Sequence, residues 1–165
     1  MKAISLWQPW ASAMAVGSKK IETRHWPTNH RGLTAIHAAK RLNKRELIYY
    51  GSCWSWCGAL RPLGKTMSDM KPLWDLMPFG AIVAVGNLID CVPTNRITLG
   101  EIEEMRSPEG EKPHMYAWNE RMMGNYELGR YAWIFNCVNA LDEPVPFKGG
   151  QGFFNVPDEL LEGKY

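Results

Sequence analysis

Residues 17–24 read Gly-Ser-Lys-Lys-Ile-Glu-Thr-Arg, a short run that places charges of both signs directly after a turn glycine. If the chain is a strand from Ile21 onward, its side chains alternate in direction, so Glu22 and Arg24 share one face. Together with Lys19 they form a charged triplet, which we predict to be the functional site. The alternative is a solvated strand face whose ion pairs contribute little.

The segments on both sides of this run predict short strands around one helix. Residues 2–7 alternate as a strand does, and Pro9 stands where helices commonly begin, before apolar residues at helical spacing that stop at Gly17. Residues 21–26 and 33–39 are the next predicted strands, with a polar loop between them. The chain therefore opens in the order strand, helix, strand, strand.

Three further β segments are predicted in the second half of the chain. Residues 81–92 are rich in apolar and β-branched residues, and Gly86 among them indicates a bulge or bend. Residues 130–139 form the next predicted strand. Residues 144–155 are punctuated by Pro and Gly and predict a hairpin.

The stretch between the predicted strands over residues 33–39 and 81–92 predicts an insertion of helices and loops over about residues 43–80. Asn43 is a suitable helix cap, and the glycines and prolines of residues 51–80 preclude one long helix, so we treat that part as a candidate lid. A further short helix is predicted over residues 99–106. Several short strands with inserted helices indicate an α+β fold, a small mixed β-barrel, in a single domain over residues 1–165.

The composition bounds the function. A chain of 165 residues that is 45% hydrophobic can bury one sizeable core, and its net charge of +2 argues against coating nucleic acid through bulk charge. The charge is unevenly distributed: residues 19–46 carry eight Lys or Arg against two Glu, whereas residues 101–165 carry six against twelve acidic residues. This asymmetry indicates a local phosphate-attracting patch, or alternatively a basic helix surface after Lys40.

The sequence offers no sign of export, membrane insertion or metal binding. The amino terminus lacks an apolar signal segment and no run approaches the length of a membrane span, so we expect a cytoplasmic protein without membrane contacts. The four cysteines are expected to be free buried thiols. Cys53 and Cys57 could share a helix face and bind zinc, but no tight second ligand pair follows them. We therefore expect no metal and no cofactor.

The charged run and its flanks resemble the ASCH domain, a relative of the PUA-type RNA-binding fold. Five blocks in the family order carry the resemblance: residues 5–11, the GxKxxExR pattern of residues 17–24, and residues 35–40, 129–133 and 144–152. The resemblance spans nearly the whole chain and implies a PUA-like barrel. It also implies that a cleft at Lys19, Glu22 and Arg24 binds RNA or a modified nucleoside.

Two hydrolytic reactions are implied by the resemblance as alternatives to binding. Some small bacterial ASCH proteins hydrolyse acetylated cytidine with the motif lysine, a threonine three residues later and a distant glutamate. Lys19 matches the lysine, but the threonine position is Glu22, Thr23 points to the opposite strand face, and we place no distant glutamate. Other members are nucleases, which without metal need proton-transfer groups and cations around the phosphate. The candidates are His37, Glu22 and Tyr131 for proton transfer, and Lys19, Arg24, Lys40 and Arg130 for phosphate.

Several of these residues also have a structural interpretation. Gln8 and Trp10 lie at the turn that the resemblance places beside the cleft, where Gln can read a base edge and Trp can stack, or they only start and bury the helix. His37 is alternatively a hydrogen-bonded core histidine, and Tyr131 an aromatic core residue. Binding ranks above catalysis because it needs only complementary donors and acceptors. The predicted site has Lys19, Glu22 and Arg24 as catalytic candidates, with Gln8, Trp10, His37, Lys40, Arg130 and Tyr131 as ligand-binding residues.

Overall fold

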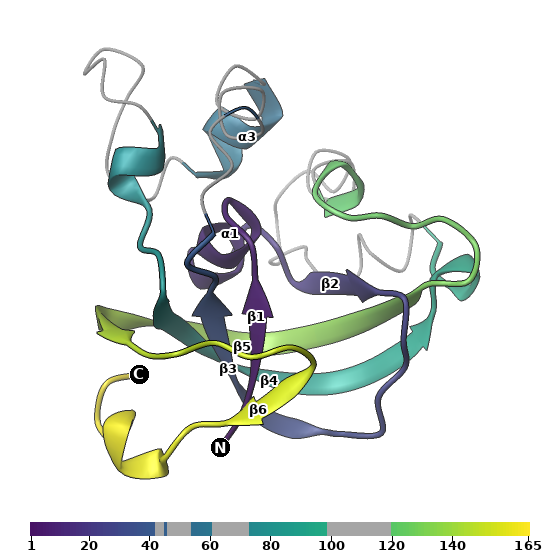
Figure 1. Ribbon diagram of the computed structural model, residues 1–165. Helices are drawn as coiled ribbons and strands as arrows, with labels where there is room; N and C mark the ends of the chain where they lie inside the picture. Colours follow the sequence, from purple (N-terminus) through teal and green to yellow (C-terminus); the bar gives the residue numbers. More distant parts are fainter. Residues whose placement is uncertain (42–44, 46–53, 61–72, 99–119) are drawn as a thin grey trace, which may run out of the picture.

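One curled sheet organises the molecule (Figure 1). The computed structural model describes residues 1–41, 45, 54–60, 73–98 and 120–165. Within these residues the strands are β1 (Lys2–Leu6), β2 (Ile21–Arg24), β3 (Gly32–Ala38), β4 (Ala81–Pro93), β5 (Tyr131–Pro146) and β6 (Phe153–Asn155). The helices are α1 (Trp10–Ala15) and α3 (Trp54–Ala59), with 3-10 turns η3 (Leu73–Leu76), η4 (Thr94–Arg96) and η5 (Asp158–Leu160).

The six strands of the described residues have the order β2-β5-β4-β3-β1-β6. β1 and β3 run parallel, and every other neighbouring pair is antiparallel. The sheet curls into half a barrel and carries few helices, which agrees with the α+β class and with the mixed strand directions predicted from the sequence (Figure 1).

The curl follows from irregular pairing between the two longest strands. The register of β4 against β5 shifts at Ile82/Ala84, Val85/Asn87 and Leu88/Asp90. Such bulges bend a strand and increase its twist, which closes a sheet on itself. The predicted irregularity at Gly86 is confirmed, and a Cβ at this position would stand 3.0 Å from a methyl group of Val138. The close approach of β5 therefore depends on glycine here.

Two apolar clusters cover the two faces of the sheet, as strand alternation requires. One face packs against α1 through residues that include Ile4, Ile36, Met14 and Trp133. The other face packs against the carboxyl-terminal segment. A third cluster joins Trp56 and Leu60 of the described part of the 43–80 insertion to α1. The helix predicted over residues 99–106 and most of the candidate lid lie outside the described residues.

The predicted hairpin over residues 144–155 is wrong. β5 continues to Pro146, which pairs with Ala81 of β4, whereas β6 pairs with β1 at the other side of the sheet. The connection over residues 147–152 therefore leads from the end of β5, beside β4, to β6, beside β1. Pro and Gly mark the ends of both strands correctly, but they do not specify which strands pair, because pairing depends on contacts distant in sequence.

None of the helices in the described part of the chain is both long and apolar enough to cross a membrane.

The crossing connection depends on Gly149. A Cβ added at this residue would stand 2.4 Å from Cε1 of His37 and 2.7 Å from Oγ of Ser5. We expect Gly149→Ala to destabilise the fold by about 1–3 kcal/mol because the buried ring cannot move aside. Chemical unfolding measures the change.

The matched control is Gly58→Ala in α3, where no heavy atom lies within 4 Å of the added Cβ. Alanine favours a helix over glycine, so this variant should keep or raise the free energy of unfolding. Equal stability of Gly149→Ala and the wild type would show that the connection does not press on His37.

Candidate functional site

The candidate site is a cleft of about 470 Å³ between β2, the start of α1 and residues 122–125. We call it the charged cleft. Its lining includes Trp7, Trp10, Glu22, Arg24, His25 and Arg130. Four of the residues predicted from the sequence, Trp10, Glu22, Arg24 and Arg130, are thus brought together in one concave surface.

The short strand β2 presents its charged side chains as the alternation predicts. Ile21 and Thr23 are buried, whereas the side chains of Glu22 and Arg24 are 12% and 24% exposed. Glu22 and Arg24 form an ion pair with 2.9 Å between Oε1 and Nε. The carboxylate at the wall of the charged cleft is therefore held in place by a neighbouring cation on the same strand.

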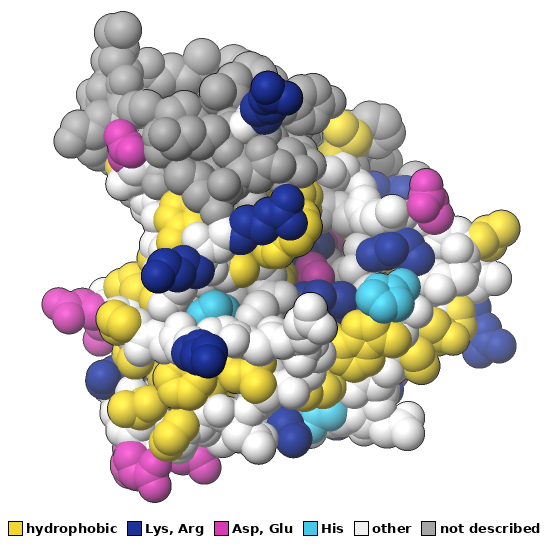
Figure 2. All heavy atoms as spheres, viewed as in Figure 1, with side chains coloured by type: hydrophobic (Ala, Val, Ile, Leu, Met, Phe, Trp, Pro, Cys, Tyr) yellow, Lys and Arg dark blue, Asp and Glu magenta, His cyan; other side chains and the backbone are white. Residues whose placement is uncertain are grey.

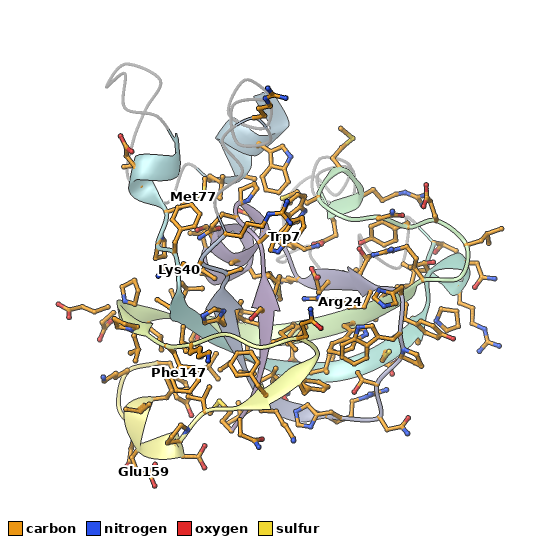
Figure 3. The ribbon with its side chains drawn as sticks, viewed as in Figure 1. Trp7, Arg24, Lys40, Met77, Phe147 and Glu159 are labelled. Carbon is orange, nitrogen blue, oxygen red and sulfur yellow. The ribbon has the colours of Figure 1, made fainter. Side chains whose placement is uncertain are left out.

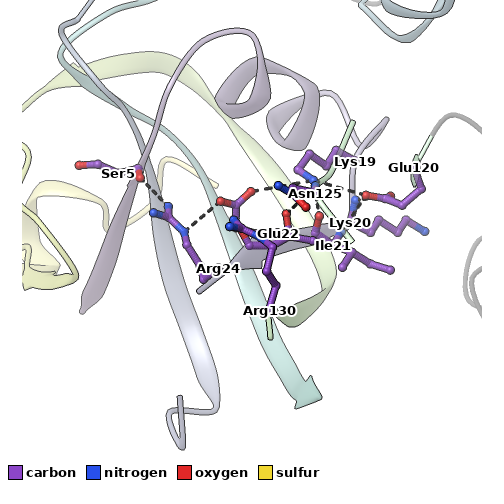
Figure 4. Close-up of polar contacts among 10 residues, drawn as sticks. Ser5, Lys19, Lys20, Ile21, Glu22, Arg24, Glu120, Asn125 and Arg130 are labelled. Atoms are coloured by element: carbon purple, nitrogen blue, oxygen red, sulfur yellow. Dashed lines mark hydrogen bonds and ion pairs between the residues drawn. The ribbon is translucent and has the colours of Figure 1, made fainter. Parts of the chain in front are cut away.

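Arg24 also bridges the open side of the curled sheet. Its Nη2 donates to the backbone carbonyl of Ser5 at 2.6 Å (Figure 4). The carbonyl of Leu6 accepts from Ala39 on the β3 side, so the preceding carbonyl of Ser5 points away from β3. β6 pairs with β1 only up to Ile4, which leaves this carbonyl to the guanidinium. β2 and β1, which are not neighbours in the sheet order, are linked through this side chain.

Lys19 lies beneath the charged cleft, with its side chain 0% exposed. Its Nζ donates to the carbonyl of Ile21, lies 3.6 Å from Oε1 of Glu120 and lies 3.9 Å from Oε2 of Glu22. A buried ammonium is stable only when carboxylates and hydrogen-bond acceptors surround it. Lys19 therefore lies on the interior side of Glu22, while Glu22 itself faces the cleft.

Glu120 belongs to this arrangement although no pattern in the sequence indicates it. It is 0% exposed, and its two oxygens also accept from the backbone N–H groups of Lys20 and Ile21 at 2.8 and 3.1 Å. A buried lysine signals that a carboxylate must be near it. The sequence contains many glutamates, however, and nothing local distinguishes one that lies about a hundred residues away.

Residues 123–130 complete the wall opposite α1. The backbone N–H of Asn125 donates to Oγ1 of Thr23 at 2.9 Å, and Nη2 of Arg130 donates to the carbonyl of Thr23 at 3.1 Å. Nε of Arg130 is buried without a hydrogen-bond partner in the described part of the chain. Arg130 is therefore oriented by β2 in the lining of the charged cleft.

Gln8 and His37 are held inside the fold and are not part of the cleft lining. The amide of Gln8 accepts from the backbone of Ser12 at 3.0 Å and donates to the carbonyl of Pro78 at 2.7 Å. Burial lowers the pKa of His37, so its ring is neutral near pH 7. Because its Nε2 lies 3.0 Å from the carbonyl of Phe147, that nitrogen carries the proton.

Lys40 and Tyr131 also lie outside the charged cleft. Lys40 is exposed just after β3, and Tyr131 is partly buried against the core cluster on the α1 side. The ligand-binding roles of four residues stay predictions: Gln8, His37, Lys40 and Tyr131. None of them lines the cleft that contains Trp10, Glu22, Arg24 and Arg130.

The described residues contain no group of three or more His, Cys, Asp or Glu side chains arranged to bind a metal ion. Cys91 and Cys137 are free thiols, as predicted, but neither is buried, because Cys91 is partly exposed and Cys137 is exposed. The two cysteines considered as zinc ligands are Cys53 and Cys57. Cys53 and the side chain of Cys57 lie outside the described part of the chain.

A scan against protein-family models matches the ASCH domain over residues 4–142. The chain belongs to the ASCH domain family. The sequence resemblance is thereby confirmed, and with it the membership in a family that is RNA-binding-like. No curated protein matches the chain.

Solved structures similar to this ASCH chain include the ASCH protein from Zymomonas mobilis. It has 15% sequence identity and a TM-score of 0.48, with 98% of this chain and 90% of that chain covered. Two point mutants of the same protein give TM-scores of 0.48 and 0.46 at 15% and 14% identity, and each match covers 98% of this chain and 93% or 91% of that chain.

The buried ion pair predicts a large stability effect. Glu120→Gln keeps the shape of the side chain but removes the carboxylate nearest to the Lys19 ammonium. Breaking a buried pair in this way costs about 3–5 kcal/mol, because the remaining charge is left buried. Urea unfolding measures the loss, and adding Lys19→Met to the variant should recover part of it.

The control is Asp90→Asn, which breaks the Arg31–Asp90 pair at 2.8 Å between side chains that are 40% and 51% exposed. Exposed pairs are screened by water, so we expect a loss below about 1 kcal/mol. A Glu120→Gln loss as small as this would mean that the Lys19 ammonium does not depend on Glu120.

Proposed function

We propose that the charged cleft binds the base of an RNA nucleotide or of a modified nucleoside. The observation that carries the proposal is the arrangement of one partly exposed carboxylate, Glu22, between two guanidinium groups, Arg24 and Arg130, in the lining of a single cleft. A base edge presents donors and acceptors side by side, and such a mixed set of protein groups is complementary to it.

Glu22 supplies the acceptor. A carboxylate has about four lone-pair sites. Oε1 faces the Nε of Arg24, and Oε2 lies 3.9 Å from the Lys19 ammonium, which is beyond hydrogen-bond distance. Acceptor sites therefore remain for the exocyclic amine of a base. Arg130 offers a donor for a ring nitrogen or carbonyl oxygen.

Two tryptophans supply apolar walls on which a base can stack. Trp7 and Trp10 both line the charged cleft, and the side chain of Trp7 is 47% exposed. Trp10 is oriented by an edge contact with Trp56, at 5.8 Å between ring centroids. Stacking on such a side chain contributes about 1–3 kcal/mol per base.

Hydrolysis of an acylated cytidine is less well supported by these positions. Lys19, which matches the lysine of that reaction, is fully buried together with its partner Glu120. The nucleophile position is Glu22, whose carboxylate is already paired. Binding requires none of these groups to leave its partner.

The proposal predicts a preference among nucleosides. Cytidine and adenosine carry an exocyclic amine, whereas uridine presents a carbonyl at the same position, so they should bind more tightly than uridine. Glu22→Gln should lower cytidine affinity about tenfold or more, because a charged acceptor is replaced by a neutral amide, which accepts a weaker hydrogen bond. Quenching of tryptophan fluorescence reports binding, since Trp7 and Trp10 line the cleft.

The control is Glu159→Gln, which removes the same charge from an exposed residue of η5 far from Arg24 (Figure 3). It should leave every affinity unchanged. Equal binding of uridine and cytidine, or full cytidine affinity in Glu22→Gln, would contradict the proposal. Release of acetate from acetylated cytidine would show the amidohydrolase reaction instead.

A metal-independent ribonuclease is the second candidate, and the position of His25 favours it. His25 lines the charged cleft together with Glu22, whereas His37, the histidine predicted for proton transfer, does not. Cleavage of RNA needs one group to take a proton from the ribose hydroxyl and another to protonate the leaving oxygen, with cations around the phosphate. Glu22, His25 and Arg24 offer these groups in one place.

This candidate predicts cleavage of single-stranded RNA in the presence of a metal chelator. His25→Ala should slow it by about a hundredfold or more, the usual contribution of a general acid or base. His30→Ala, which removes an imidazole that does not line the cleft, is the control. Gel analysis of end-labelled RNA measures the rate, and intact RNA with the wild-type protein would reject the nuclease while leaving the binding proposal in place.

A further inference from the structure

We propose that the ligand is a single RNA strand whose backbone leaves the charged cleft past Trp7 and follows a row of cations at one edge of the sheet. This inference rests on the proposed function and deepens it, because it assigns the strand rather than a free nucleoside. The row comprises Arg41, Lys40 and Lys148, and we call it the basic row.

The topology of the sheet assembles the basic row from distant parts of the chain. Leu6 pairs with Ala38, Ala38 with Ala81, and Ala81 with Pro146, so four neighbouring strands reach the same edge in register. Adjacent strands lie about 4.8 Å apart, so the row of strand ends extends for roughly 14 Å. The residues that directly follow or precede these ends share that edge.

Trp7 follows β1 at this edge, Lys40 and Arg41 follow β3, and Lys148 follows β5. Figure 3 shows Trp7 and Lys40 above the ends of β1 and β3, with Phe147 at the side where β5 ends. The N–H of Phe147 donates to the carbonyl of Gly80 at 3.0 Å, and the Lys40 side chain runs along Gly80. These contacts bring Lys148 close to Lys40.

The basic row is continuous with the charged cleft through one side chain. Trp7 lines the cleft, and the guanidinium of Arg41 lies over its ring at 4.5 Å from the centroid. A base stacked in the cleft and a phosphate at Arg41 would therefore be placed on either side of the same exposed tryptophan. Aromatic side chains alternating with cations are typical of surfaces that bind single strands.

No ion pair among the described residues neutralises the cations of the basic row. Lys40, Arg41 and Lys148 are exposed, and none forms an ion pair with a carboxylate of the described residues. Arg24, by contrast, is paired with Glu22, and Arg31 is paired with Asp90. Figure 2 shows several Lys and Arg side chains with hydrophobic side chains between them on this face. Unpaired cations beside a base-binding cleft favour a polyanion that also carries bases, which is a nucleic acid strand.

The test compares a single-stranded RNA with a free nucleoside on the same variants. Single-strand sites cover about 4–16 nucleotides, so a strand of roughly ten is suitable. In Lys40→Ala/Lys148→Ala the affinity for RNA should fall about tenfold relative to the affinity for cytidine. The slope of log K against log salt should become shallower by about 1.4, since each phosphate contact on a single strand contributes about 0.7.

The matched control is Lys2→Ala/Lys164→Ala, which removes two exposed lysines away from this edge. It should leave the ratio of RNA to cytidine affinity unchanged. Wild-type RNA affinity and salt slope in Lys40→Ala/Lys148→Ala, with cytidine affinity still sensitive to Glu22→Gln, would overturn the basic row and leave the cleft intact. If instead the wild-type protein bound cytidine no more tightly than uridine, while RNA binding still depended on the basic row, the proposed function would be overturned.

A competition experiment distinguishes a nucleic acid from another polyanion. Polyglutamate of equal charge should displace the RNA poorly, because it offers no base for the charged cleft. Displacement at equal concentration would overturn the assignment to RNA and indicate an acidic protein segment as the partner.

Discussion

The burial of the Lys19 ammonium is the constraint on which the rest of the site depends. An ammonium removed from water is destabilising by several kcal/mol unless charges and hydrogen bonds compensate it. Here the carbonyl of Ile21 and the carboxylates of Glu120 and Glu22 provide the compensation. The interactions continue outward: Glu22 pairs with Arg24, and Arg24 donates to Ser5 on β1. One chain of charges thus runs from the interior to the wall of the charged cleft and across the open side of the sheet.

The same contacts explain how β2 can be so short and still be well placed. β2 has four residues, and among the described strands it pairs with β5 alone, so the ladder of these strands leaves the backbone groups of its other edge unpaired. Side chains satisfy these groups: Glu120 accepts from the N–H groups before and at the start of the strand, and Arg130 donates to the carbonyl of Thr23. Buried backbone groups need such partners. β2 is therefore positioned by polar side chains as much as by its ladder.

The sequence predicted what local patterns determine and missed what pairing over long distances determines. The alternation of Ile21, Glu22, Thr23 and Arg24 directed two charges to one face, and the bulge at Gly86 followed from its place in an apolar strand. Partners across the fold leave no local signal, so the role of Glu120 beneath β2 was not visible. The sequence also did not indicate that β5 and β6 pair with different strands, because turn residues mark the ends of strands and not their neighbours.

The distribution of charge distinguishes the charged cleft from the basic row. Lys19 and Glu120 compensate each other in the interior, so the described lining of the charged cleft presents one carboxylate and two guanidinium groups. A phosphate placed there would meet the negative charge of Glu22, whereas the edge of a base would find both donors and acceptors. The exposed cations after β3 and β5 have no paired carboxylate in the described residues, and they suit phosphate. Because Trp7 joins the two surfaces, a ligand that fits both must carry a flat polar ring and a charged backbone in sequence.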